Sequence, residues 1–155
     1  MIENQIYDAA HSGDLEKVRV WLEQHPDRLN SEVSDGYNLL HIACAFGHPA
    51  LVSFLLGRMA LVNVNAANSS QATPLHLATA FRDEAVACAI AEELVANGAE
   101  LNAKQADGTT PLHHAISRGA ARLTARLVEA GADPHLKDAQ GRTSAQLAKE
   151  TGVLL

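Results

Sequence analysis

The feature that most constrains the fold is a six-residue motif that recurs along the chain. Residues 73–78 read TPLHLA and residues 110–115 read TPLHHA. Weaker copies begin at Asn4, Asn38 and Thr143, so that successive copies start 34, 35, 37 and 33 residues apart. Periods of about 20 to 50 residues are typical of stacked repeat units, and we therefore predict an array of similar units.

Each copy of the motif has the features of a helix start. The first residue is always Asn or Thr, whose side chain accepts hydrogen bonds from the unpaired amides that open a helix. We therefore expect N-caps at Asn4, Asn38, Thr73, Thr110 and Thr143. Proline follows two of these caps, at the first helical position, where it is favoured. The sequence thus predicts one helix at the start of every repeat.

Two further columns agree with this register. Alanine stands five residues after every cap, where a neighbouring helix approaches closely: Ala9, Ala43, Ala78, Ala115 and Ala148. Glycine stands nine residues after four of the caps and suits the left-handed backbone that ends a helix: Gly13, Gly47, Gly119 and Gly152. A second segment with apolar residues at helical spacing then follows in the first four repeats, which predicts helix pairs with one buried face each.

The recurring motif resembles the ankyrin repeat. The residues that carry the resemblance are TPLH, Gly47-His48, GADPH at 131–135, and the Asp-Gly pairs at 35–36 and 107–108. It implies an all-α ankyrin-repeat solenoid of stacked helix–turn–helix units with short hairpin-like loops. We expect a single domain over residues 1–155, with repeats at about 4–34, 35–69, 70–106 and 107–139 and a truncated repeat at 140–155.

Composition excludes several classes of function. The net charge is -6, and the 12 Lys and Arg residues are scattered, so we expect no nucleic-acid partner. No segment reaches the roughly 20 apolar residues that span a bilayer, and no export signal is present, so we expect a cytoplasmic protein without membrane contact. The two cysteines, Cys44 and Cys88, are too few and too widely spaced for a disulfide framework or a zinc pair.

The histidines of the motif invite a metal-site interpretation, which we reject. His41, His76 and His113 lie on successive units about 10 Å apart, whereas one zinc ion needs ligand bonds of about 2 Å. In ankyrin proteins this histidine hydrogen-bonds the backbone of a neighbouring repeat, and the resemblance implies the same role for these three. We expect neither a metal nor a cofactor.

A catalytic interpretation has little support in the sequence. Cys44 lies near His41 and His48, as a nucleophile and its base would, but it stands where the resemblance implies a small packing residue. Glu92 and Glu93 are adjacent on a predicted helix and point about 100 degrees apart, so they cannot flank one substrate bond. No other catalytic motif is present. We therefore expect a protein that is not an enzyme.

Three departures from the repeat pattern are visible. In the third repeat Arg82 replaces the turn glycine, and the repeat has four additional residues. They predict a longer second helix capped by Asp83, which is either a harmless extension or a protruding recognition element. The loop at 63–73 is two residues longer than its counterpart, so we expect it to be looser. The apolar residues 153–155 either cap the last helix or form an exposed end for a partner or a second copy.

The resemblance implies that a partner protein docks on a concave surface formed by the hairpin tips and the first helices. Our predicted partner-binding residues are Asp35, Tyr37, Phe46, Phe81, Asp107, Thr109, Ser117 and Arg118. The three aromatic residues among them are the candidate hot spots, unless they only fill gaps between neighbouring loops. We thus predict a monomeric, non-catalytic protein-interaction module. The alternative is a homo-oligomeric scaffold that assembles through the C-terminal end or the insertion in the third repeat.

Overall fold

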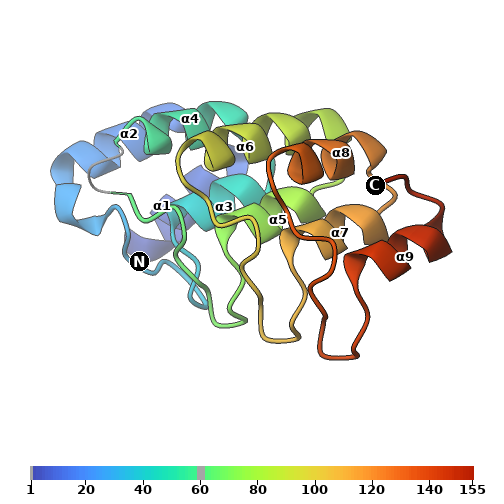
Figure 1. The fold of residues 1–155 in the computed structure, drawn as a ribbon. Coiled ribbons are helices and arrows are strands. Elements are labelled where there is room, and N and C mark those ends of the chain that lie inside the picture. Colours follow the sequence, from blue (N-terminus) through green and yellow to red (C-terminus); the bar gives the residue numbers. More distant parts are fainter. Residues whose placement is uncertain (1, 59–61) are drawn as a thin grey trace.

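The chain forms a two-layered stack of helices (Figure 1), described by the computed structural model for residues 2–58 and 62–155. The inner layer contains α1 (Ile2–Ser12), α3 (Leu39–Ala45), α5 (Pro74–Ala80), α7 (Pro111–Ser117) and α9 (Ser144–Thr151). The outer layer contains α2 (Leu15–Gln24), α4 (Pro49–Leu56), α6 (Glu84–Ala96) and α8 (Ala121–Glu129), and the short 3-10 helix η1 (Pro26–Arg28) follows α2. Successive helices of each layer are in contact, which confirms the predicted all-α solenoid.

The predicted caps start four of the inner helices. The Oδ1 atom of Asn38 accepts a hydrogen bond from the amide of His41 at 3.0 Å. The same cap position is held by Thr73, Thr110 and Thr143. The prediction is wrong for Asn4, which lies inside α1. The residues just before Asn4 continue the helix instead of forming the extended hairpin arm that positions the other caps.

The core is a continuous apolar layer between the helices. The alanine column is buried at every repeat, as predicted, with Ala43, Ala78 and Ala115 all at 0% exposure. Large aliphatic side chains from both layers fill the space between neighbouring repeats. At about 25 cal/mol per Å2 of apolar surface removed from water, this layer is the main source of stability, and each unit depends on its neighbours for it.

The histidines of the motif tie each inner helix to the next repeat. Nδ1 of His76 accepts a hydrogen bond from the Thr73 amide at 3.2 Å, so Nε2 carries the proton and donates to the Thr109 carbonyl, also at 3.2 Å. The other two histidines make the equivalent bond at the same distance, His41 to the carbonyl of Ala72 and His113 to that of Arg142. These bonds confirm the role that the resemblance implied.

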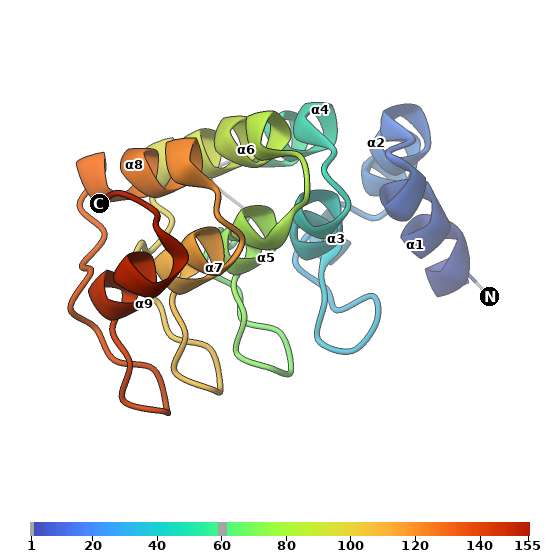
Figure 2. The same ribbon diagram turned by 90° about the vertical axis from the view of Figure 1, so that its right-hand side faces the viewer.

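The hairpin loops project together from one side of the stack (Figure 2). Backbone hydrogen bonds join neighbouring tips: the Ala106 amide donates to the Ser70 carbonyl at 2.9 Å, and the Ala139 amide donates to the Asp107 carbonyl at 2.8 Å. The longer loop at 63–73 belongs to this ladder through Ser70. The hairpins are thus fastened to one another as well as to the helices.

The third repeat has the longer outer helix that its sequence predicts. α6 has 13 residues, against 8 in α4 and 9 in α8, a difference of about one turn. Asp83 caps it as expected, since its Oδ1 accepts hydrogen bonds from the amides of Ala85 and Val86 at 2.9 and 3.2 Å. None of the described helices combines the length and apolar composition needed to cross a membrane.

Candidate partner-binding face

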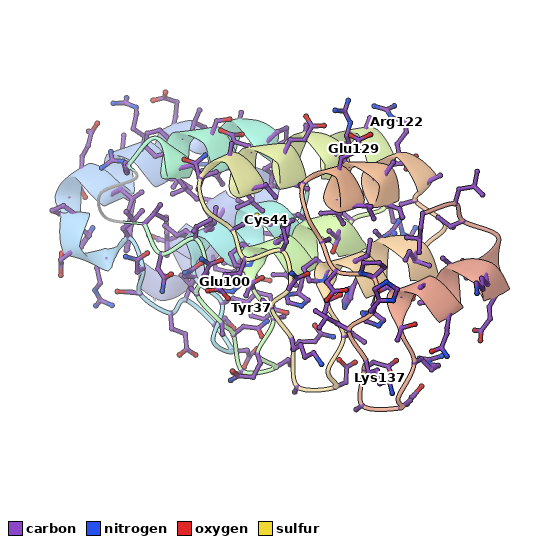
Figure 3. The ribbon with its side chains drawn as sticks, viewed as in Figure 1. Tyr37, Cys44, Glu100, Arg122, Glu129 and Lys137 are labelled. Carbon is purple, nitrogen blue, oxygen red and sulfur yellow. The ribbon has the colours of Figure 1, made fainter. Side chains whose placement is uncertain are left out.

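The hairpin arms and the exposed sides of the inner helices form one continuous surface, which we call the inner face (Figures 1 and 2). Figure 3 shows Tyr37 and Lys137 on the side of the inner helices and hairpins, whereas Arg122 and Glu129 lie at α8 in the outer layer. The predicted partner-binding residues come from the loops and helix ends that bound the inner face. Their side chains nevertheless have different surroundings.

Three of the predicted residues lie together in a hollow of about 300 Å3 where α1, the first hairpin and α3 meet. Its lining is Tyr7, Ser34, Asp35, Tyr37, Ile42, Ala45 and Phe46. Phe46 is 38% exposed, and its ring centroid lies 4.0 Å from that of His11. The hollow, which we call the aromatic hollow, therefore combines three aromatic rings with one carboxylate.

Phe46, Phe81 and Arg118 occupy the same position in successive repeats, and each contacts the end of the preceding inner helix. Phe81 is half-buried, and its ring lies over Gly47 so closely that a side chain at Gly47 would collide with it. The guanidinium of Arg118 donates a hydrogen bond to the carbonyl of Ala80 at the end of α5. Phe81 and Arg118 thus support the stack, while Phe46 leaves more of its ring open.

Asp107 and Thr109 interact with each other across the third hairpin. Thr109 donates to Oδ1 of Asp107 from its amide at 3.0 Å and from its hydroxyl at 2.6 Å, and these bonds lower the pKa of the Asp107 carboxyl. The Thr109 hydroxyl also lies 3.3 Å from Nε2 of His114, whose pKa is lowered by burial. Ser117 is exposed at the end of α7. This part of the inner face is polar and internally bonded.

The residues considered for catalysis are buried or bonded to other partners. Cys44 is fully buried, and burial raises the pKa of its thiol, so it remains protonated at neutral pH. His48 is bonded through Nε2 to the His11 carbonyl at 2.7 Å. Glu92 and Glu93 face different partners, the guanidinium of Arg126 at 3.3 Å and the hydroxyl of Ser53 at 2.7 Å. Neither Cys44 with its neighbouring histidines nor the Glu92–Glu93 pair has the geometry of a catalytic site.

The histidine column has no metal-binding geometry either. Among the side chains that the structure describes, no three or more of His, Cys, Asp or Glu form a cluster that could hold an ion. Burial lowers the pKa of His41, and lowers the pKa of His76 to about 4. Both imidazoles are therefore neutral at neutral pH, as their hydrogen bonds to backbone groups require.

Two members of the hollow and its surroundings were missed in the sequence. Tyr7 comes from α1 and lines the hollow opposite the first hairpin, and His11 packs on Phe46. The available signal was that Tyr7 interrupts the histidine column at the first repeat. Tyr7 has a phenol ring where the later repeats have the imidazole. The first inter-repeat junction is therefore lined by aromatic side chains, whereas the later junctions carry the hydrogen-bonded histidines.

Comparison with known proteins agrees with this architecture. The family model described as ankyrin repeats (3 copies) matches residues 6–105, and the model described as ankyrin repeats (many copies) matches residues 86–148. Rabankyrin-5 of Mus musculus is 34% identical over 149 residues, which cover 91% of this chain and 13% of that protein. The nuclear factor NF-kappa-B p105 subunit of Gallus gallus is 34% identical over 131 residues, which cover 84% of this chain and 13% of that protein.

A third relative is the NF-kappa-B inhibitor alpha of Sus scrofa, 35% identical over 80 residues, which cover 52% of this chain and 26% of that protein. The chain therefore spans only a small part of the length of these relatives. Ankyrin repeats are modules of protein–protein interaction, whose stacking creates extended binding surfaces. The repeat period, the stacked helix pairs and the matching family models together show that this chain belongs to the ankyrin-repeat family.

Proposed function

We propose that the protein is a non-catalytic interaction module that binds a partner protein on its inner face. The observation that carries this proposal is the aromatic hollow, which is open on that face and contains the partly exposed Phe46. Aromatic side chains in a preformed pocket are typical centres of binding energy in protein interfaces. We place the centre of the interface at Asp35, Tyr37 and Phe46.

The remaining predicted residues extend this interface along the inner face. Ser117 offers an exposed hydroxyl. Asp107 and Thr109 form a polar rim, and their side chains are already hydrogen-bonded to each other. Phe81 and Arg118 contribute mainly by holding consecutive inner helices together. This division follows from their contacts, because a side chain that already packs on its own chain gains less from a partner.

The rigidity of the inner face favours this function. Hydrogen bonds between hairpin tips and from the histidines to the next repeat fix its shape before any partner arrives. Binding to a preformed surface loses less conformational entropy than binding that must first order loops. The array therefore acts as a scaffold that presents the hollow in a fixed geometry.

The proposal is tested by capture of partner proteins on immobilised protein, followed by mass spectrometry. Phe46→Ala removes the exposed ring from the hollow, so partners held by the wild-type protein should be lost. Val20→Ala is the matched control, because Val20 is exposed to a similar extent (44%) but lies on α2. Equal capture by the wild type and Phe46→Ala would contradict the proposed face, provided that both variants melt near the parent temperature.

Self-association is a second candidate function, and the end of the array favours it. Leu154 and Leu155 are 86% and 49% exposed beside a hollow of about 330 Å3 that also contains Ala145 and Val153. Exposed neighbouring leucines are typical of contact surfaces. The insertion in the third repeat has less claim to this role, because the helix that contains it, α6, already bonds the next repeat through Glu84.

Light scattering separates the two candidates. If the apolar end drives assembly, the wild-type protein should form dimers or larger species that Leu154→Ser together with Leu155→Ser converts to monomers. A monomer for both proteins at all concentrations would remove self-association and leave partner binding.

A further inference from the structure

We propose that the aromatic hollow recognises a cationic side chain of the partner, with arginine preferred over lysine. This inference rests on the proposed function and adds the chemistry of the bound group. It starts from the composition of the hollow, whose lining contains Tyr7, Tyr37 and Phe46 as rings, Asp35 as its only charged group, and no cation.

The aromatic rings supply the first attraction. A cation within about 6 Å of a ring face is drawn to the negative potential of the π system, most strongly where water is partly excluded. Tyr7 and Tyr37 are half-buried and Phe46 is held by His11, so the rings are fixed before a ligand enters. Neither tyrosine hydroxyl is hydrogen-bonded to another described residue, which leaves both available as acceptors for a bound cation.

The carboxylate supplies the second attraction. Asp35 forms no ion pair within the described ranges, and its side chain receives only the hydroxyl of Ser34 at 3.3 Å. A guanidinium can pair with this carboxylate through two parallel N–H bonds while its plane stacks on a ring. The ammonium group of lysine is not planar, so it cannot pair with the carboxylate through two parallel bonds and stack on a ring at the same time. We therefore expect a preference for arginine.

The equivalent place between the third and fourth repeats shows that these features are specific to the first junction. Asp107 corresponds to Asp35, since each directly precedes a hairpin glycine, but its carboxylate already accepts two hydrogen bonds from Thr109. Arg118 stands where Phe46 stands in the second repeat, so a cation occupies the place of the ring. That junction is thus satisfied internally and repels a further cation.

The test uses three capped tripeptides, acetyl-Gly-X-Gly-amide, in which X is arginine, lysine or citrulline. Citrulline has the shape of arginine without its charge. Each is titrated into the whole isotope-labelled protein, and the aromatic NMR resonances of the hollow are followed. The arginine peptide should shift the resonances of Tyr37 and Phe46 saturably at millimolar concentrations. The citrulline peptide should bind at least about fivefold more weakly, as loss of a partly desolvated cation–π and charge contact implies.

Variants give the matched comparison. Asp35→Asn and Phe46→Leu should each weaken arginine binding, the first by removing the charge and the second by removing the ring while keeping an apolar side chain. Phe46→Tyr should retain binding, and Asp107→Asn should leave it unchanged. Added salt should weaken binding to the wild type more than to Asp35→Asn, because salt screens a charge pair.

The inference is overturned if the arginine peptide produces no saturable shift, if citrulline binds equally, or if Asp107→Asn matters as much as Asp35→Asn. These failures are distinct from failure of the proposed function. If Phe46→Ala still abolishes partner capture, the inner face remains the interface and only the cationic ligand is wrong. If Phe46→Ala leaves partner capture intact, the face itself is wrong.

Discussion

The carboxylate of Glu84 caps a helix in the next repeat: its Oε1 accepts a hydrogen bond from the amide of Arg122 at 2.7 Å. The amide of Leu123 donates to the same oxygen at 3.2 Å. α8 needs this cap because Ala120, at its N-cap position, has no side-chain acceptor. The bond joins the first residue of α6 to the next repeat. Glu84 stands six residues after the alanine column, as Pro49 and Ala121 do, so the additional turn lies at the other end of α6. Arg122 lies at α8 in Figure 3.

Replacement of Glu84 should therefore weaken the junction between the third and fourth repeats. We expect Glu84→Ala to lower the free energy of unfolding by about 1 kcal/mol, as loss of a helix cap does, and Glu84→Gln to lose less because it keeps an acceptor oxygen. Urea denaturation followed by circular dichroism measures the difference. Glu100→Ala, which removes an exposed carboxylate elsewhere, is the control, and an equal loss in both alanine variants would show that the cap contributes nothing.

The second hairpin should be stabilised by glycine. Gln71 has a φ of 60° at a position where the other hairpins have Gly36, Gly108 and Gly141. Left-handed backbone costs a residue with a Cβ about 1 kcal/mol relative to glycine. Gln71→Gly should thus raise the unfolding free energy by roughly 0.5 to 1 kcal/mol after the entropy cost of glycine. Gln140→Gly, at a tip position with ordinary φ, should instead lower it, and the same direction in both variants would refute the argument.

The sequence was most informative where one residue acts on its near neighbours. The caps at Asn38, Thr73 and Asp83 depend on contacts within a few residues, and all three were predicted. The histidine bonds are long-range, but they recur at the three junctions after the first, so the resemblance to a family of repeats was enough to imply them.

Contacts specific to one junction could not be predicted in the same way. Phe81 and Phe46 stand in one column, yet one covers Gly47 and the other lines an open hollow, because their neighbours in the adjacent repeat differ. The Glu84 cap joins residues 38 positions apart and has no counterpart among the described residues of the other junctions. Its only sequence signal was the alanine at the start of α8. The aromatic hollow similarly depends on Tyr7, whose significance appears only when α1 is placed beside the first hairpin.

Stability should decrease as the pH falls from about 6.5 to about 4. Burial lowers the pKa of His76 from an ordinary 6.5 to about 4, so in this window the unfolded chain binds a proton that the folded chain does not. The folded state therefore loses stability with falling pH, by on the order of 3 kcal/mol for His76 alone, and His76 contributes no pH dependence above this window. The Asp107 carboxyl, whose pKa is lowered in the folded state, affects stability only at lower pH, below its ordinary pKa of 3.8.

Urea denaturation at a series of pH values measures this dependence. His76→Gln, which keeps hydrogen-bonding groups but cannot titrate, should be less stable than the wild type at pH 7 and show a shallower slope between pH 6.5 and 4. His135→Gln changes an exposed histidine outside the motif and serves as the control. An unchanged slope in the His76 variant would assign the acid sensitivity to other groups.

Cys44 should be almost unreactive in the folded protein. Its thiol has 0% exposure, and burial raises its pKa, so neither access nor the thiolate form needed for reaction is present. A neutral thiol reagent at pH 7 should label Cys44 only at the rate at which the stack opens, and labelling should accelerate with urea in parallel with the loss of helical signal. The Cys88→Ala background isolates this site. Rapid labelling without urea would instead mean that Cys44 is accessible and activated, and would reopen the catalytic interpretation that its burial argues against.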